Sequence, residues 1–188
     1  MSKLCRVYAS LNDDTIVFIR EIRSTDKANL ARGLEGMSEE SRYKRFLGPK
    51  PSLSEAELRY LTEVDGHDHH ALVAVSAGQE EQIVAVARYV RLPDDPLAAE
   101  AAITVCDDVQ GKGLGSLLAR RISDAARENG IERITATIAS DNRPALALMR
   151  QIDARLAGAP VGSSVTELVA QLPEAPVDEA AHSPAAAA

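Results

Sequence analysis

Residues 103–116 read Ile-Thr-Val-Cys-Asp-Asp-Val-Gln-Gly-Lys-Gly-Leu-Gly-Ser, and this stretch decides the fold. It begins in an apolar segment, residues 97–106, that is typical of a central β-strand, and it runs into an amphipathic helix expected over residues 113–129. Glycines at positions 111, 113 and 115 let successive backbone amides point outward together. Because a helix start adds unpaired N–H donors, the turn is expected to bind a pyrophosphate. The alternative is a turn whose glycines serve backbone geometry alone.

Two nucleotide-binding motifs fail here on particular residues. A P-loop, GxxxxGK followed by Ser or Thr, would need glycine in place of Cys106, and Gly113 follows Lys112 where the motif needs a hydroxyl. The dinucleotide motif GxGxxG would need glycine in place of Ser116. The expected pyrophosphate therefore belongs to neither kind of nucleotide site.

Strands and helices alternate on both sides of this stretch. Alternating and β-branched apolar residues predict strands over residues 15–22, 71–77, 83–92, 97–106, 133–139, 154–159 and 165–172, with a polar turn at 65–70. Cap and stop residues predict helices from Ser24 to the glycines at 33–36, after Ser38, over 55–64 behind a Ser54–Glu57 capping box, and from Asp141 or Asn142 to about 152. The strand–helix–strand unit at 97–139 implies one parallel crossover in an otherwise largely antiparallel sheet. The fold class is therefore α/β (α+β mixed), with helices on both faces.

Size and charge fit one compact domain that does not bind nucleic acid. The chain has 188 residues, and 45% of them are hydrophobic, which is enough for a core. The formal net charge is −7, from 21 Lys and Arg against 28 Asp and Glu, and the chain has no Trp and two Phe. Nucleic-acid binding depends on positive charge and aromatic stacking, so both values argue against it.

The chain divides into three segments. Residues 1–14 are an N-terminal segment without the apolar centre of a secretory signal, residues 15–172 are the domain, and residues 173–188 are a disordered tail of Ala, Pro and acidic residues. No apolar run approaches the ~20 residues that cross a bilayer. Cys5 and Cys106 lie far apart and make no metal-ligand spacing. We expect a cytoplasmic protein without a disulfide, a metal or a membrane partner.

One family pattern does fit the glycine-rich turn. Gln110-x-x-Gly113-x-Gly115 resembles the (Gln/Arg)-x-x-Gly-x-(Gly/Ala) signature of the GNAT superfamily of acyl-CoA N-acetyltransferases, and Asn142 with Ala145 resembles that superfamily's next landmark. The resemblance covers about residues 15–172. It implies a GNAT-like, mostly antiparallel mixed sheet of about seven strands, splayed between strands 97–106 and 133–139. Residues 40–46, 53–58 and 71–75 resemble the acetyltransferase domain of bacterial protein lysine acetyltransferases.

The resemblance also implies which residues hold the co-substrate, acetyl-CoA. The CoA pyrophosphate would lie on the backbone amides of the turn and of the first helical residues, and the backbone of two residues of strand 97–106 would pair with the pantetheine arm like an added strand. Gln110 would shape the loop, and the helix start at Asn142 and Ala145 would approach the cofactor from across the splay. The set is Ile103, Val105, Gln110, Gly111, Lys112, Gly113, Leu114, Gly115, Ser116, Asn142 and Ala145.

Glu100 is the expected catalytic base. Direct transfer of acetyl to an amine needs the neutral amine, because an ammonium has no lone pair. Glu100 is the one charged residue in strand 97–106, and apolar neighbours are expected to raise its pKa by desolvation. The resembling lysine acetyltransferases place a catalytic Glu at this point. The alternative is a Glu that is solvated or structural. The superfamily's proton-donating Tyr, seven residues after the Asn, is here Met149, which we expect to pack against the core or the cofactor.

Other chemically suggestive residues are interpreted as structural. Cys106 has no neighbouring His in the sequence to activate it, so we expect a packed thiol rather than an acetyl carrier. His67, His69 and His70 fit no metal-ligand spacing and are expected in a solvated loop near the acceptor. The basic run Arg42, Lys44 and Arg45 is interpreted as a solvated helix face rather than a specificity patch.

Three functions stay open at this point. The favoured one is transfer of acetyl from acetyl-CoA to a protein lysine. The second keeps the chemistry but uses a small amine as the acceptor, and the third is an acyl-CoA-binding module without turnover, for which the missing acid at Met149 is the main support. The acceptor, the acyl-chain specificity, the regulation and the choice between monomer and homodimer are not determined by the sequence.

Overall fold

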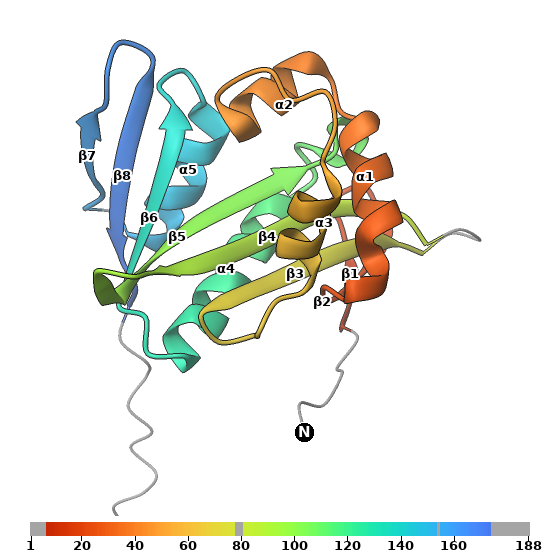
Figure 1. Ribbon diagram of the computed structural model, residues 1–188, viewed down its shortest axis with the longest axis horizontal. Helices are drawn as coiled ribbons and strands as arrows, with labels where there is room; N and C mark the ends of the chain where they lie inside the picture. Colours follow the sequence, from red (N-terminus) through yellow and green to blue (C-terminus); the bar gives the residue numbers. More distant parts are fainter. Residues whose placement is uncertain (1–6, 78–80, 154, 174–188) are drawn as a thin grey trace, which may run out of the picture.

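The computed structural model describes residues 7–77, 81–153 and 155–173. Within them the strands form a single mixed sheet with the order β1-β2-β3-β4-β5-β6-β8-β7 (Figure 1). Every neighbouring pair is antiparallel except β5 and β6, which are parallel. The strands are β1 (Val7–Ser10), β2 (Ile16–Glu21), β3 (His69–Ser76), β4 (Ile83–Leu92), β5 (Asp95–Val105), β6 (Arg133–Ala139), β7 (Ala157–Pro160) and β8 (Val165–Gln171).

Helices cover both faces of the sheet, as predicted. The helices α1 (Lys27–Glu35), α2 (Glu39–Phe46) and α3 (Glu55–Thr62) lie on one face, and α4 (Leu114–Glu128) and α5 (Arg143–Ile152) lie on the other (Figure 1). Each layer has its own buried apolar cluster. Phe18, Val73 and Val75 pack with Leu30 beneath α1, and Leu118 of α4 belongs to the larger cluster on the opposite face.

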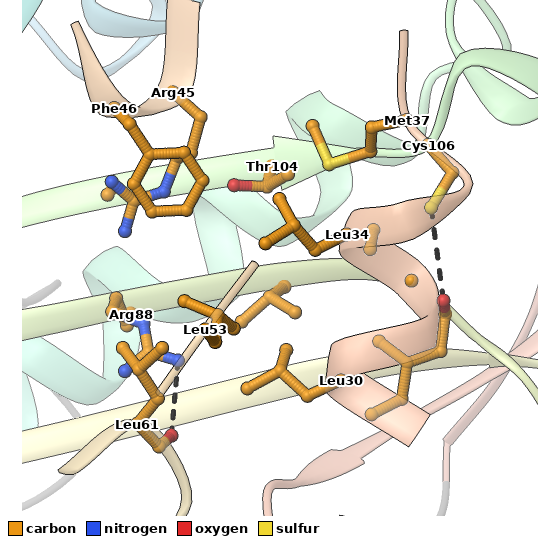
Figure 2. A pocket seen from close by; sticks show the side chains of 15 residues that line it. Leu30, Leu34, Met37, Arg45, Phe46, Leu53, Leu61, Arg88, Thr104 and Cys106 are labelled. Atoms are coloured by element: carbon orange, nitrogen blue, oxygen red, sulfur yellow. Dashed lines mark hydrogen bonds between the residues drawn. The ribbon is translucent and has the colours of Figure 1, made fainter. Parts of the chain in front are cut away.

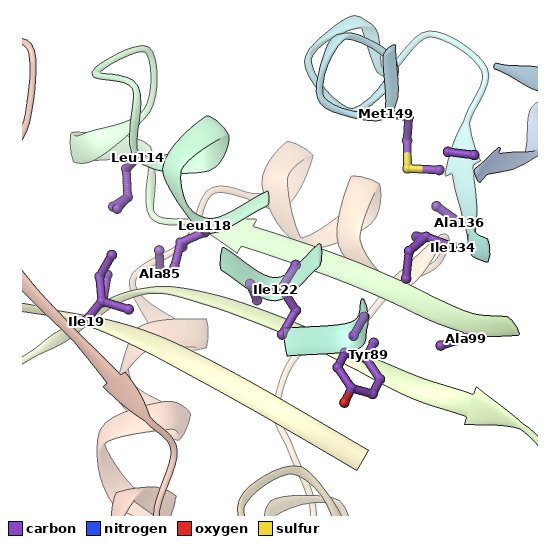
Figure 3. Close-up of a cluster of buried hydrophobic side chains, with 14 of the residues drawn as sticks. Ile19, Ala85, Tyr89, Ala99, Leu114, Leu118, Ile122, Ile134, Ala136 and Met149 are labelled. Carbon is purple, nitrogen blue, oxygen red and sulfur yellow. The ribbon is translucent and has the colours of Figure 1, made fainter. Parts of the chain in front are cut away.

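The helix that follows the glycine-rich turn anchors the larger cluster. Leu114, Leu118 and Ile122 are at most 2% exposed, so the four-residue spacing in the sequence is the buried face of α4 (Figure 3). Burying each of these side chains stabilises the fold by about 1.5–3 kcal/mol. Because this face fixes α4 on the sheet, it also fixes where the first turn of α4 points.

The parallel pair β5–β6 separates soon after it starts. Its register contains three pairs, Ala98 with Arg133, Ala99 with Ile134 and Glu100 with Thr135. β5 continues to Val105, and it stays paired with β4 over that length. The edge of β5 beyond Glu100 is therefore unpaired on the β6 side, which confirms the predicted splay.

Three local predictions are wrong. The sheet has eight strands rather than about seven, because Val7–Ser10, in the segment set before the domain, pairs antiparallel with β2. Ser24 makes no side-chain cap; Asp26 accepts from the Arg23 amide at 2.8 Å instead. His69 opens β3 rather than closing a polar turn.

Other cap predictions are confirmed. Ser38 accepts from the Ser41 amide, and Ser54 and Glu57 form a capping box. The predicted start of a strand at Ala154 and the predicted tail beyond Pro173 lie outside the described residues. No helix among the described residues has the length and apolar character needed to span a membrane.

Candidate active site

The turn between β5 and α4 presents a row of free backbone amides. Gly111 and Gly113 have φ of +73° and +86°, a region that glycine adopts without strain. The first intrahelical bond at this end runs from the Leu117 amide to the Gly113 carbonyl at 3.1 Å. Within the described residues, no hydrogen bond uses the amides of residues 111–116. Six N–H groups at a helix start are therefore available to an anion.

The turn between β1 and β2 holds this loop in place. The Asn12 amide donates to the Lys112 carbonyl at 3.1 Å, and the Lys112 ammonium lies 2.8 Å from an Asp13 carboxylate oxygen. The hydrogen bond from Lys112 is the largest cause that lowers the pKa of Asp13 to about 2. A Cβ on Gly113 would lie 3.3 Å from Asn12 Oδ1, so the two segments are in close contact. Nothing in the sequence signalled this contact, because the residues are about 100 positions apart.

A second set of contacts connects the loop to α2 on the opposite face. Asp107 accepts from the Ser38 amide at 2.9 Å, from the Ser38 hydroxyl at 3.0 Å and from the Ser41 hydroxyl at 2.6 Å. These bonds lower the pKa of Asp107, with the Ser41 hydroxyl contributing most. The Gln110 amide nitrogen donates to the Val105 carbonyl at 3.0 Å and to Ser41 Oγ at 3.2 Å. Gln110 therefore connects the loop to the end of β5 and to α2.

The splay brings the remaining predicted cofactor residues to its two sides. Ile103 and Val105 lie on the part of β5 that has no partner strand on the β6 side. Across the gap, Asn142 Oδ1 accepts from the Ala145 amide at 3.1 Å and so begins α5. Gly115 is packed closely against α5, because a Cβ there would lie 3.5 Å from Leu148. The strands and helices thus gather the predicted set around one opening.

Glu100 lies at the point where β5 and β6 part. It is paired with Thr135 in the last register pair, and strand alternation puts it on the same face as Ala102 and Thr104, which line a pocket. The expected burial of Glu100 is wrong, because the residue is exposed at the sheet surface. The negative charge of Glu100 raises the pKa of Arg45 in α2, and burial lowers the pKa of Arg45 more strongly.

Two sulfur-containing residues have structural surroundings. Met149 is 6% exposed and belongs to the cluster that includes Ile134 and Ala136 (Figure 3), so core packing is its role here. Cys106 is half-buried, and burial, with the charges of Asp107 and Asp108, raises the pKa of its thiol. A thiol that ionises poorly is a weak nucleophile, in agreement with the structural interpretation of Cys106.

The histidines do not form the solvated loop that the sequence analysis expected. His69 and His70 are 9% and 7% exposed, and the His69 Nε2 lies 3.1 Å from an Arg88 guanidinium nitrogen. Only His67 has an exposed side chain, which lies beside Asp68. The expectation failed because the Asp65 carboxylate accepts from the amides of residues 67–69 and folds them into the start of β3. Among the described residues, no cluster of His, Cys, Asp and Glu fits a metal ion.

A pocket opens between α1, α2, α3 and the β4–β5 face of the sheet (Figure 2). It is open to solvent at its mouth, and most of its lining is apolar. Arg45 and Arg88 are the two charged residues in the lining. The interpretation of Arg45 as part of a solvated helix face is therefore wrong, because α2 turns this side chain into the pocket.

Comparisons with known proteins agree on one family. The profile of the Acetyltransferase (GNAT) family matches residues 37–153. The chain is 32% identical over 161 residues to Acetyltransferase Pat of Mycolicibacterium smegmatis, which covers 86% of this chain and 46% of that protein. It is 33% identical over 135 residues to Acetyltransferase PA5475 of Pseudomonas aeruginosa, covering 71% and 72% of the two chains. The chain therefore spans less than half the length of the first of these relatives.

Solved structures give the same result for the fold. The GNAT domain of S. lividans PAT superposes with a TM-score of 0.77 at 30% identity, covering 89% of this chain and 97% of that one. The cAMP-binding acyltransferase from Mycobacterium smegmatis superposes with a TM-score of 0.63 at 27% identity, covering 96% of this chain and 50% of that one.

Proposed function

Because the chain belongs to the GNAT acetyltransferase family, we propose that it moves an acetyl group from acetyl-CoA directly to a primary amine, with a protein lysine side chain as the favoured acceptor. The observation that carries the proposal is the coincidence of two features at one opening. The parallel strands part after Glu100, and the free amides of residues 111–116 lie at the end of the unpaired β5 edge.

These features match the three parts of the acetyl-CoA molecule. The diphosphate would accept hydrogen bonds from the loop amides, where the positive end of α4 also favours negative charge. The pantetheine amides would pair with the unpaired backbone near Ile103 and Val105, as an added strand does. This placement would bring the thioester back along β5 toward Glu100.

The chemistry follows from that placement. Glu100 would take a proton from the acceptor ammonium, directly or through a water molecule, and free its lone pair. The amine nitrogen then attacks the thioester carbonyl carbon, and the C–S bond breaks as the tetrahedral intermediate collapses. CoA leaves as a thiolate, and the nitrogen loses its second proton to solvent. Met149 has no proton to donate, so water is the expected source for the thiolate.

The lysine acceptor is proposed on likeness alone. The relatives named Pat and PAT share about 30% identity with this chain, and the N-terminal half resembles bacterial lysine acetyltransferases. A small amine is the second candidate, favoured by the pocket between α1, α2 and α3. A panel of lysine peptides and small amines, with CoA release as the readout, decides between them. If none of the acceptors in the panel leads to CoA release, while CoA still binds, the result would favour a binding module without turnover.

Glu100→Gln tests the mechanism. General-base catalysis contributes about 10²–10⁴-fold, so the variant is expected to lose at least about 10²-fold in kcat at neutral pH while it binds acetyl-CoA normally. Glu132→Gln is the matched control, because Glu132 is also exposed but precedes β6, at the end away from the opening. A Glu100→Gln enzyme with the kcat of the control across the pH range would remove Glu100 from the mechanism.

A further inference from the structure

The pocket beneath α1, α2 and α3 has a charged end and an apolar end. Figure 2 shows the guanidinium groups of Arg45 and Arg88 toward one end, and Met37 and Cys106 toward the other. Leucine side chains fill the space between the ends, among them Leu34. The pocket thus combines an apolar lining with two cations at one place.

The two arginines have no carboxylate between them. Arg88 is 6% exposed, and its guanidinium donates to the Leu61 carbonyl at 3.2 Å and to His69 Nε2 at 3.1 Å, both neutral partners. Within the described residues, the guanidinium of Arg45 takes part in no hydrogen bond or ion pair, and its central carbon lies 5.0 Å from the centre of the Phe46 ring. Arg88 is buried and Arg45 is partly buried, and charges removed from water are normally paired, so this arrangement is unusual.

The charges also act on one another. Burial, together with the positive charge of Arg45, lowers the pKa of Arg88 to about 10. Glu100 is the carboxylate whose charge opposes this effect at Arg45, where it raises the pKa of the guanidinium. Two guanidiniums and one carboxylate leave one positive charge uncompensated, since burial lowers the pKa of His69 and keeps the imidazole neutral. A single bound negative charge would balance the site.

The reaction makes this imbalance worse. The acceptor arrives as an ammonium, and on the proposed mechanism it pairs with Glu100. Arg45 then loses its only opposing charge, and both guanidiniums lack a counter-ion. An acceptor that also carries a negative group adds no net charge, so it prevents this second uncompensated positive charge. A carboxylate suits the site better than a phosphate, because it carries a single charge into apolar surroundings and accepts two parallel bonds from a guanidinium.

We propose that the pocket is a carboxylate-recognition subsite of the acceptor site, in which Arg45 and Arg88 bind a carboxylate of the same acceptor molecule whose amine lies at Glu100. The apolar lining would hold the aliphatic part of that acceptor. Glu100 and Ala102 are two residues apart on one strand face, and Ala102 is opposite Arg88, so Glu100 and Arg88 are diagonal neighbours about 7–8 Å apart at the backbone. This inference rests on the proposed function.

The test compares acceptors that differ only in this charge. One arm uses lysine peptides with Glu or Gln beside the acceptor lysine, and the other uses free leucine and leucinamide. We expect the carboxylate form to have a kcat/KM at least about tenfold higher in one of the two arms, which also identifies its source. Equal kcat/KM values for both forms in both arms would overturn the proposal, although acetyl transfer itself would stand.

Arg45 variants identify the residue responsible. Arg45→Gln is expected to bring the carboxylate preference to within about threefold, and Arg45→Lys, which keeps the charge, is expected to retain part of it. Arg42→Gln is the matched control, because Arg42 lies on the same helix and does not line the pocket. An Arg45→Gln enzyme that keeps the full preference would also overturn the proposal, and Arg45→Lys answers the same question if the Gln variant does not fold.

The two proposals fail in different ways. If no compound in the panel is acetylated, the proposed function fails, and calorimetry with the same compounds decides the subsite. Binding of the carboxylate forms that Arg45→Gln weakens would keep the subsite, and equal binding of carboxylate and amide forms would exclude it.

Discussion

Gly113→Ala is the most informative single change in the loop. Gly113 has φ of +86° and begins α4, and a Cβ there would lie 3.3 Å from Asn12 Oδ1 and 3.4 Å from Asn12 Nδ2. Contacts of this length require a shift of a few tenths of an ångström. Because the Asn12 backbone N–H is bonded to the Lys112 carbonyl, the Asn12 side chain is held beside the loop, and we expect the shift to be shared between that side chain and the loop amides.

The expected effect has two separable parts. The left-handed backbone of an alanine costs about 1–2 kcal/mol of unfolding free energy, partly offset by about 0.4–1 kcal/mol from the stiffer unfolded chain. Displacing even one amide from the diphosphate removes a hydrogen bond to a charged group, and at about 1.5 kcal/mol this weakens CoA binding about tenfold.

Gly130→Ala separates the two parts. Gly130 follows the other end of α4 with φ of +77°, and a Cβ there would have no atom within 4 Å. Urea unfolding is expected to show a similar loss of stability in both variants, and calorimetry is expected to show weakened CoA binding in Gly113→Ala alone. Equal CoA dissociation constants for the two variants would refute the assignment of the loop amides to the diphosphate.

Two further predictions concern the framework of the site. In the wild-type protein the buried Arg20 is bonded to both Asp26 carboxylate oxygens, at 2.7 and 2.8 Å. Asp26→Asn removes the counter-charge of Arg20, so it is expected to lower the unfolding free energy by about 3–5 kcal/mol, measured by urea unfolding. Burial raises the pKa of Asp26, but the hydrogen bonds from Arg20 and the Arg23 amide outweigh burial, so the net pKa is lowered. The stabilisation by Asp26 in the wild-type protein is therefore expected at neutral pH. It is expected to be lost as the pH falls below about 3.9, the pKa of Asp in the unfolded chain. Asp107→Asn is expected to lower the unfolding free energy by about 1–2 kcal/mol, because an amide NH₂ would face donors of Ser38; an unchanged melting curve would contradict this.

Local patterns predicted the parts of the site that are made by neighbouring residues. The turn, the helix after it and the Asn142 cap each depend on contacts within a few positions, so glycine spacing, apolar periodicity and cap chemistry were sufficient. The splay was predicted from the resemblance, and the register of β5 and β6 agrees with it.

Contacts between distant residues were not predictable in this way. The four residues of β1 are too few to show a strand pattern, and their pairing with β2 brings Asn12 and Asp13 to the loop. Arg45 stands in a run of charged residues that resembles any solvated helix face, and only the packing of α2 over the sheet shows that it lines a pocket. The predicted burial of Glu100 was likewise wrong, because apolar neighbours along a strand do not bury a side chain that lies on an exposed part of the sheet.

A crystal structure of the protein with CoA tests the central claim most directly. Diphosphate oxygens are expected at about 2.7–3.2 Å from backbone amide nitrogens within residues 111–116, with the pantetheine arm along β5 beyond Glu100. A diphosphate bound elsewhere on the protein, with those amides still free, would contradict it.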